Sequence, residues 1–174
     1  MTHTGFHVAD PQDHALIAEP KDDDRMIGNI PVFDPRETRK FETGGGGLVS
    51  NVRDYARFMQ MLMNRGELDG VRILSPMTVD YMLTDQLGEI GRGKYYLPGD
   101  GYGFGLGVAV RTRDGASGLM GNVGDFFWGG AAGTYMVGDP HEDMFLVYMV
   151  QSPKNAMLLR GIIRNMVYGS IEER

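Results

Sequence analysis

The sequence FFWGGAAGTYMVGDPHEDMFLVYMV, residues 126–150, decides the fold class. Residues 126–137 and 144–150 each have the composition of a strand, and the polar residues 139–143 between them have the length of a hairpin loop. Two strands joined by so short a loop pair in antiparallel fashion. We therefore predict a β-hairpin here, with an antiparallel sheet built around it.

A further strand is predicted upstream, over residues 102–110, because large and small side chains alternate there without a break. One face of this strand presents Tyr102, Phe104, Leu106, Val108 and Val110, and the other is almost bare glycine. A bare face lets another backbone approach closely.

A final helix is predicted downstream of the hairpin, where Ser152 and Pro153 form a typical helix start. Its broad apolar face consists of Leu158, Leu159, Ile162, Ile163, Met166 and Val167. Such a face packs on a sheet. Residues 100–174 thus predict antiparallel strands with a C-terminal helix against them, which is an α+β fold class.

Residues 48–90 predict a helical segment. Asn51, with Asp54 three residues later, is typical of a helix N-cap. The apolar residues that follow have the spacing of an amphipathic helix, namely Tyr55, Phe58, Met59 and Leu62. Gly66 is a suitable stop, and Ser75 followed by Pro76 begins a second helix that extends to about residue 83.

Residues 1–47 predict loops and extended segments. Their periodicity is poor, and prolines stand at positions 11, 20, 31 and 35. Because this segment has no evident core of its own, we expect it to lie across a core supplied by something else. We predict one partial domain over residues 1–174, divided into segments 1–47, 48–90 and 100–174.

The composition narrows the class of protein. The chain has 174 residues, of which 42% are hydrophobic and 23% charged, as in soluble globular proteins. Its net charge of −6, with no cluster of Lys or Arg, argues against a nucleic-acid partner. The absence of cysteine excludes disulfides and thiolate metal sites. No apolar run is long enough to span a membrane, and residues 1–5 show no secretory signal.

Several segments, taken in order, resemble one enzyme family. They are GGGGLVSNVRDYARF (44–58), GELDGVRILSPMTV (66–79), YGFGLG (102–107), WGGAAGT (128–134) and the pair Asp139-Pro140. In this order they resemble the β-lactamase-related serine hydrolases, which include class C β-lactamases, D-alanyl-D-alanine carboxypeptidases and related esterases. The opening MTHTGF (1–6) is similar to the segment just after that family's central helical region. The resemblance implies the C-terminal part of the β-lactamase/penicillin-binding-protein fold.

The resemblance also implies a substrate-binding strand at Trp128, Gly129, Gly130 and Ala131. Family members carry a Lys/His/Trp-Thr/Gly-Gly triplet beside the active site, and Trp-Gly-Gly looks like the version of the esterase branch. Glycines would let the acyl substrate lie along the strand, and the Ala131 N–H would be one oxyanion-hole donor. Trp128 in place of a cationic group would suit esters better than carboxylate-bearing β-lactams. Spacing alone is also compatible with a strand bulge that carries a half-buried tryptophan.

The family's catalytic motifs are absent from residues 1–174. None of the lysines, at positions 21, 40, 94 and 154, has a serine three residues earlier, so there is no Ser-x-x-Lys nucleophile. No asparagine completes a Tyr-x-Asn or Ser-x-Asn motif. In the family both motifs lie upstream of the segment that residues 1–6 resemble. We therefore expect a truncated hydrolase that is inactive alone.

Other chemistries are less well supported by the sequence. His3 and His7 are four residues apart, so both imidazoles could bind one metal ion only if the segment were helical. Gly5 between them disfavours a helix. The glycine tract lacks a P-loop ending, and residues 22–24 lack the ligand pattern of an EF-hand, so a tight turn and a solvated charge run are expected. Ser152 is interpreted as a helix cap. We predict no metal and no cofactor.

Two functional hypotheses remain open. The first is the C-terminal part of a serine hydrolase, which takes an acyl-ester or β-lactam-like substrate when completed by its N-terminal half. The second is a non-catalytic ligand-binding or assembly module derived from that fold. In either case, apolar surface on the sheet would face water, and we expect self-association or a partner that covers it.

Overall fold

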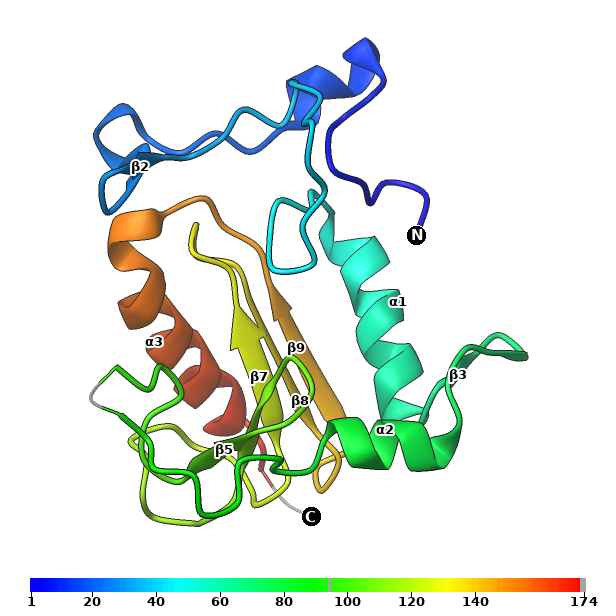
Figure 1. Ribbon diagram of the computed structural model, residues 1–174, viewed down its shortest axis with the longest axis vertical. Coiled ribbons are helices and arrows are strands. Elements are labelled where there is room, and N and C mark those ends of the chain that lie inside the picture. Colours follow the sequence, from blue (N-terminus) through cyan, green and yellow to red (C-terminus); the bar gives the residue numbers. More distant parts are fainter. Residues whose placement is uncertain (94, 173–174) are drawn as a thin grey trace.

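A five-stranded antiparallel sheet between two helices organises the computed structural model, which describes residues 1–93 and 95–172 (Figure 1). The strands follow one another in space as in sequence: β5 (Tyr102–Phe104), β6 (Ala109–Arg111), β7 (Phe126–Gly129), β8 (Tyr135–Asp139) and β9 (Met144–Tyr148). Helix α1 (Val52–Met63) covers one face, and helix α3 (Ala156–Tyr168) covers the other. The predicted α+β class, with a C-terminal helix on an antiparallel sheet, is confirmed.

Two strands were predicted too long, because each turned out to be a tight hairpin. Residues 102–110 form β5 and β6, which pair Phe104 with Ala109. Gly107 lies between them at a φ of +88°, a left-handed conformation that favours glycine. Residues 126–137 likewise divide into β7 and part of β8, and the Gly133 N–H donates to the Gly130 carbonyl (2.9 Å) across the turn. The hairpin predicted around residues 139–143 is confirmed as β8 and β9.

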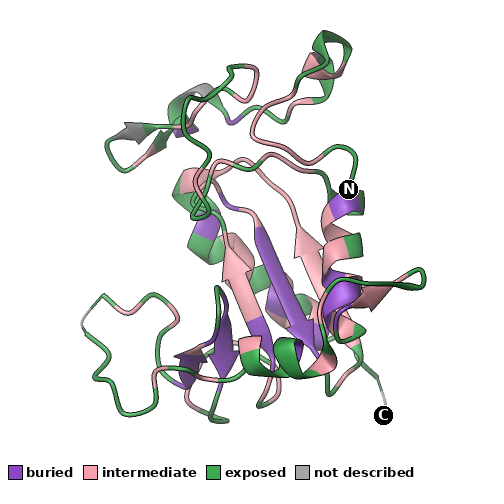
Figure 2. Cartoon of the chain, turned by 45° about the vertical axis from the view of Figure 1, so that its right-hand side comes forward, coloured by how far each residue is buried: buried purple, intermediate pink, exposed green. Residues whose placement is uncertain are grey.

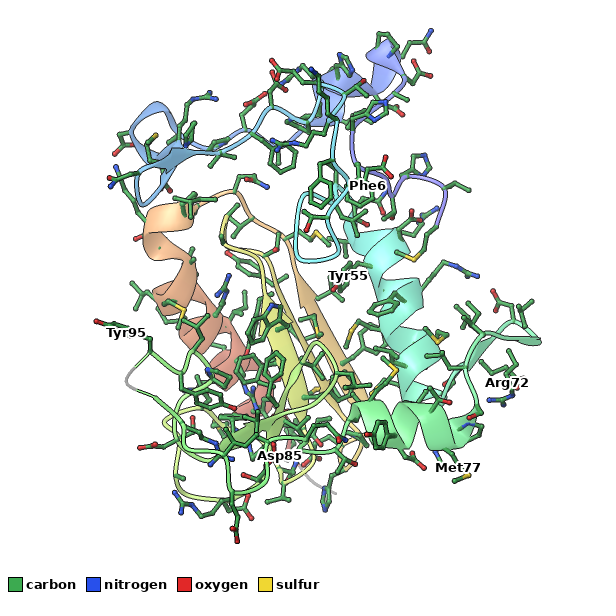
Figure 3. All side chains as sticks on the ribbon, in the orientation of Figure 1. Phe6, Tyr55, Arg72, Met77, Asp85 and Tyr95 are labelled. Carbon is green, nitrogen blue, oxygen red and sulfur yellow. The ribbon has the colours of Figure 1, made fainter. Side chains whose placement is uncertain are left out.

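Helix α1 begins where the sequence predicts. The Asn51 side chain caps it by accepting a hydrogen bond from the Asp54 N–H (2.8 Å). Its inner side supplies Met59 and Leu62 to the core, and Figure 3 shows Tyr55 on the side of α1 that faces the sheet. Under α1 lies a cluster of buried apolar side chains, namely Met59, Met61, Leu62, Val108, Val110, Phe126 and Met136.

Helix α2 (Pro76–Met82) also confirms its prediction, with Ser75 as the N-cap that accepts from the Thr78 N–H (3.1 Å). The two-stranded ribbon of β3 (Glu67–Leu68) and β4 (Val71–Arg72) joins it to α1. The end of α2 lies against the glycine-rich hairpin, where a Cβ at Gly105 would stand 2.1 Å from the Met82 carbonyl oxygen. The close approach predicted for the bare glycine face is therefore present.

The N-terminal segment crosses one end of the sheet (Figure 1). It contains the 3-10 turns η1 (Pro11–Leu16) and η2 (Asp22–Asp24) and the short strands β1 (Met26–Ile27) and β2 (Ile30–Pro31). Asp24 was predicted in a solvated charge run, but it is 5% exposed and accepts from Ser152 Oγ (2.9 Å) and the Lys154 N–H (2.8 Å). Ser152 is the N-cap residue of η3 (Pro153–Asn155), which leads into α3 at Ala156, but its hydroxyl makes no capping hydrogen bond and donates to Asp24 instead.

Helix α3 does not use its predicted apolar face as expected. Leu158, Ile162 and Met166 are exposed, whereas Arg164 is fully buried. The inner stripe repeats every four residues through Ala156, Arg160, Arg164 and Tyr168. Strand β8 is buried along its whole length, and in Figure 2 it lies in front of α3, whose turns are partly exposed. None of the helices in the described residues has the length and apolar character needed to cross a membrane.

Candidate functional site

The four predicted site residues lie together where β7 ends. Trp128 and Gly129 are its last two residues, and Gly130 and Ala131 begin the turn into β8. Strand β8 pairs with β7 throughout, but β6 pairs only with Phe126 and the residue after it. Within the described residues no strand pairs with the β6 side of Trp128 and Gly129. This edge therefore has no strand partner among the described residues.

Trp128 forms the apolar wall beside this edge. Its ring meets that of Phe104 edge to face, with the ring centroids 5.1 Å apart. It also packs against the core under α1 and is only half-buried. The indole thus extends the apolar core to the open end of β7.

Side chains of neighbouring elements lie close to Gly129 and Gly130. A Cβ at Gly129 would lie 2.5 Å from Cζ of Arg160, so the bare face of this residue is filled by a guanidinium from α3. A Cβ at Gly130 would lie 2.4 Å from Oγ1 of Thr134. The Gly130 N–H donates to the Thr134 carbonyl (2.9 Å), and its own carbonyl accepts from Arg160 Nη2.

Ala131 carries the free amide of the site. It is exposed in the turn between β7 and β8, and its N–H has no acceptor among residues 1–93 and 95–172. A free backbone N–H beside an open strand edge is a donor available to an incoming oxygen.

A buried ionic cluster, Arg111, Asp125 and Arg164, lies behind the beginning of β7. Oδ2 of Asp125 accepts from Nε of Arg111 and from Nη2 of Arg164, both at 2.6 Å. All three side chains are at most 3% exposed. Asp125 directly precedes β7, so the cluster fixes the base of the candidate strand.

Tyrosines and a second carboxylate surround this cluster. Arg111 donates to the Tyr102 hydroxyl (2.5 Å), Arg164 donates to that of Tyr135 (3.2 Å), and the Tyr168 hydroxyl donates to buried Asp139 (2.8 Å). Burial raises the pKa of Tyr102 to about 12. Burial also raises the pKa of Tyr135, and burial together with the Asp139 carboxylate raises that of Tyr168.

The sequence interpretation missed both Arg160 and this cluster. Charged residues on a helix are expected to face solvent, and the apolar residues of α3 suggested another inner face. The available signal was the four-residue spacing of Arg160, Arg164 and Tyr168, which places them on one side of a helix.

The other candidate sites have little support. His3 lies in the exposed N-terminal turn, and its backbone N–H donates to Asp54 (2.8 Å). No group of three or more His, Asp or Glu residues is arranged to hold a metal in the described part of the chain. A pocket of about 370 Å³ has Met120, Asn122, Glu142 and Tyr168 in its lining, and none of the four predicted site residues.

The antiparallel sheet with a helix on each face is part of the β-lactamase fold. Two solved structures share this fold: EstCE1, described as a hydrolase with promiscuous acyltransferase activity, and simvastatin synthase (LovD) from Aspergillus terreus. EstCE1 has a TM-score of 0.64 and 24% identity over 82% of this chain and 37% of its own. The unliganded selenomethionyl form of LovD has a TM-score of 0.59 and 20% identity over 75% of this chain and 37% of its own.

The chain belongs to the β-lactamase family, whose model matches residues 1–167. It is 38% identical over 159 residues to two proteins of Mycobacterium tuberculosis, Protein Rv1367c of strain H37Rv and Uncharacterized protein MT1414 of strain CDC 1551 / Oshkosh. Each match covers 87% of this chain and 40% of the relative. The chain thus spans well under half the length of the relatives and structures that it matches.

Proposed function

We propose that this chain forms the acyl-binding side of a serine hydrolase active site that acts on esters. The open edge of β7, with the free Ala131 N–H beside Trp128, carries this proposal. The nucleophile and its base come from a part of the enzyme outside residues 1–174, because neither Ser-x-x-Lys nor Tyr-x-Asn occurs within them.

In this proposal the acyl group of the substrate lies along Trp128 and Gly129, and its carbonyl oxygen faces the Ala131 N–H. Attack by a serine turns that oxygen into an oxyanion, and a donor already in place stabilises the developing charge. The loss of one such donor typically costs about 10²–10³ in kcat. The indole of Trp128 offers no charge to a substrate carboxylate, which favours neutral esters over β-lactams.

The shared fold of EstCE1, a hydrolase with promiscuous acyltransferase activity, supports acyl chemistry on this scaffold. The test is a chimera in which residues 1–174 replace the matching segment of Protein Rv1367c, assayed with p-nitrophenyl butyrate, nitrocefin and a serine-directed phosphonate. We expect ester hydrolysis above nitrocefin turnover, and a phosphonate adduct on a serine outside this chain.

The intact relative serves as the control for the chimera. A chimera that melts cooperatively but neither hydrolyses esters nor forms an adduct, beside a relative that does both, would contradict the proposal. An adduct on a serine within residues 1–174 would contradict it as well.

We also propose that the remaining part of the hydrolase covers the outer side of α3, and that this chain alone self-associates there. Met157, Leu158, Ile162 and Met166 are 47–71% exposed on that side. Apolar stripes of this kind mark interfaces. Light scattering at micromolar concentration should show oligomers that the double substitution L158Q/I162Q reduces; a clean monomer of the unchanged chain would count against this assignment.

A further inference from the structure

Arg160 occupies an unusual place for a guanidinium. It is half-buried between α3 and β7, and it has no carboxylate partner in the described part of the chain. Its Cζ lies 5.9 Å from the ring centroid of Tyr135, and its Nε is buried without a hydrogen-bond partner. Burial lowers the pKa of this side chain. Because burial removes water from the guanidinium, the side chain is expected to donate a hydrogen bond to a specific acceptor in the protein.

That acceptor is the carbonyl of Gly130, to which Arg160 Nη2 donates. The fold makes room for this contact at Gly129, where a Cβ would stand 2.5 Å from Cζ and 2.8 Å from Nε of Arg160. An alanine at this position would push the guanidinium away from the strand. Gly129 and Arg160 therefore form a matched pair, joined by the backbone of the candidate site.

The Gly130 carbonyl and the Ala131 N–H belong to the same peptide unit. No peptide bond in the described residues is cis, so this carbonyl and this N–H point in opposite directions. The Gly133 N–H also donates to this oxygen (2.9 Å), and Arg160 adds a second, charged donor that holds the oxygen on the α3 side and the N–H away from α3. A charged donor on the carbonyl also polarises the amide and strengthens its N–H as a donor.

We infer that Arg160 is a positioning residue, which orients and polarises the Ala131 amide as an oxyanion-hole donor. This inference rests on the proposed function for the role of the amide, but the contact itself belongs to this chain. Helix α3 would thus contribute to catalysis indirectly, because its Arg160 acts on the peptide unit that follows β7.

The first test needs no catalysis. Nuclear magnetic resonance of the labelled 174-residue chain should detect a scalar coupling across the hydrogen bond between Arg160 Nη and the Gly130 carbonyl carbon. R160M should abolish that coupling and shift the Ala131 amide proton upfield, more than any amide outside residues 128–135. R160K should restore part of the shift, and G129A should reproduce it from the other side of the contact.

The matched control is R57M, because Arg57 is an exposed α1 arginine that pairs with Asp69 away from β7. It should leave the Ala131 amide unchanged. An Ala131 amide that is equally unmoved by R160M would overturn the inference, whatever the melting temperature does. If R160M prevents folding, R160K and G129A decide the question by the same shift.

The second test places R160M and R160K in the chimera with Protein Rv1367c. We expect R160M to lower kcat about tenfold with little change in KM, since the amide stays but its peptide unit loses the charged donor on the Gly130 carbonyl. A shifted Ala131 amide with an unchanged kcat would overturn the catalytic role. An inactive chimera with a shifted amide would instead count against the proposed function and leave the Arg160 contact standing.

Discussion

The two faces of the sheet are held by different interactions. The face under α1 is apolar, with Met59 and Phe126 fully buried. The face under α3 buries two guanidiniums and two carboxylates, those of Arg111, Arg164, Asp125 and Asp139. Apolar packing is non-directional and adjusts to many side chains, whereas a buried ion pair fixes atoms at defined distances. The α3 face is therefore suited to holding a backbone in place, and the candidate strand runs along it.

The largest effect is expected on the α3 face. D125A leaves two guanidiniums buried without their shared carboxylate, and breaking a buried ion pair costs about 3–5 kcal/mol. Urea unfolding measures the loss of unfolding free energy. The triple substitution R111M/D125L/R164L should lose less than D125A alone, because it removes the unpaired charges together. A D125A variant as stable as the unchanged chain would contradict the claim that buried ion pairs hold the α3 face.

On the α1 face, M59A should cost about 2–5 kcal/mol, through lost transfer free energy and the cavity left behind. Urea unfolding measures this loss of unfolding free energy, and the dependence of that free energy on urea concentration should stay unchanged. The Ala131 amide resonance should move less than in R160M, since the charged contact on its peptide unit comes from the α3 face. A shift of that amide in M59A as large as in R160M would show that the apolar face also positions the site.

Alkaline pH should destabilise the protein because Tyr102 is buried in a neutral form on the α3 face. Tyr102, with its pKa raised to about 12, stays neutral in the folded state, whereas an unfolded tyrosine ionises near pH 10. Since the folded pKa is the higher one, this stability is complete below about pH 10 and is lost as the pH rises toward 12. Absorbance at 295 nm, followed beside circular dichroism, should show that Tyr102 ionises only as the protein unfolds. Ionisation of Tyr102 near pH 10 in a protein that stays folded would refute this.

The smallest effect is expected outside both faces. R57M removes an ion pair whose side chains are 50% and 63% exposed, so the unfolding free energy should change by at most about 0.5 kcal/mol. Thermal unfolding of R57M and D125A, measured side by side, checks this difference. A loss comparable to that of D125A would mean that burial does not explain the difference between the two ion pairs.

The sequence predicted features that depend on local signals. The Asn51 cap and the stripe through Met59 and Leu62 lie within one helix, so α1 could be read from neighbouring residues. The alternation in residues 102–110 was read as one strand, because a tight hairpin with glycine in its turn keeps the same pattern. The strand that contains Trp128 was predicted from the composition of residues 126–137, whereas its substrate-binding role came from the family resemblance.

The features that were missed depend on segments far apart in the chain. Arg164 is buried because Asp125, in another segment, is already placed to receive it. Arg160 lies against the strand because Gly129 leaves space there. Neither partner can be found from the periodicity of α3, which pointed to Leu158 and Ile162 instead. The contribution of Arg160 and Arg164 could therefore be found only from the three-dimensional structure.

The most direct test of the central claim uses the pure 174-residue chain. It is incubated with p-nitrophenyl butyrate and with a serine-directed phosphonate, and its intact mass is measured. The account predicts neither turnover nor an adduct, because the acyl-binding strand is present without a nucleophile. Turnover with an adduct on Ser50, Ser75, Ser117, Ser152 or Ser170 would contradict it.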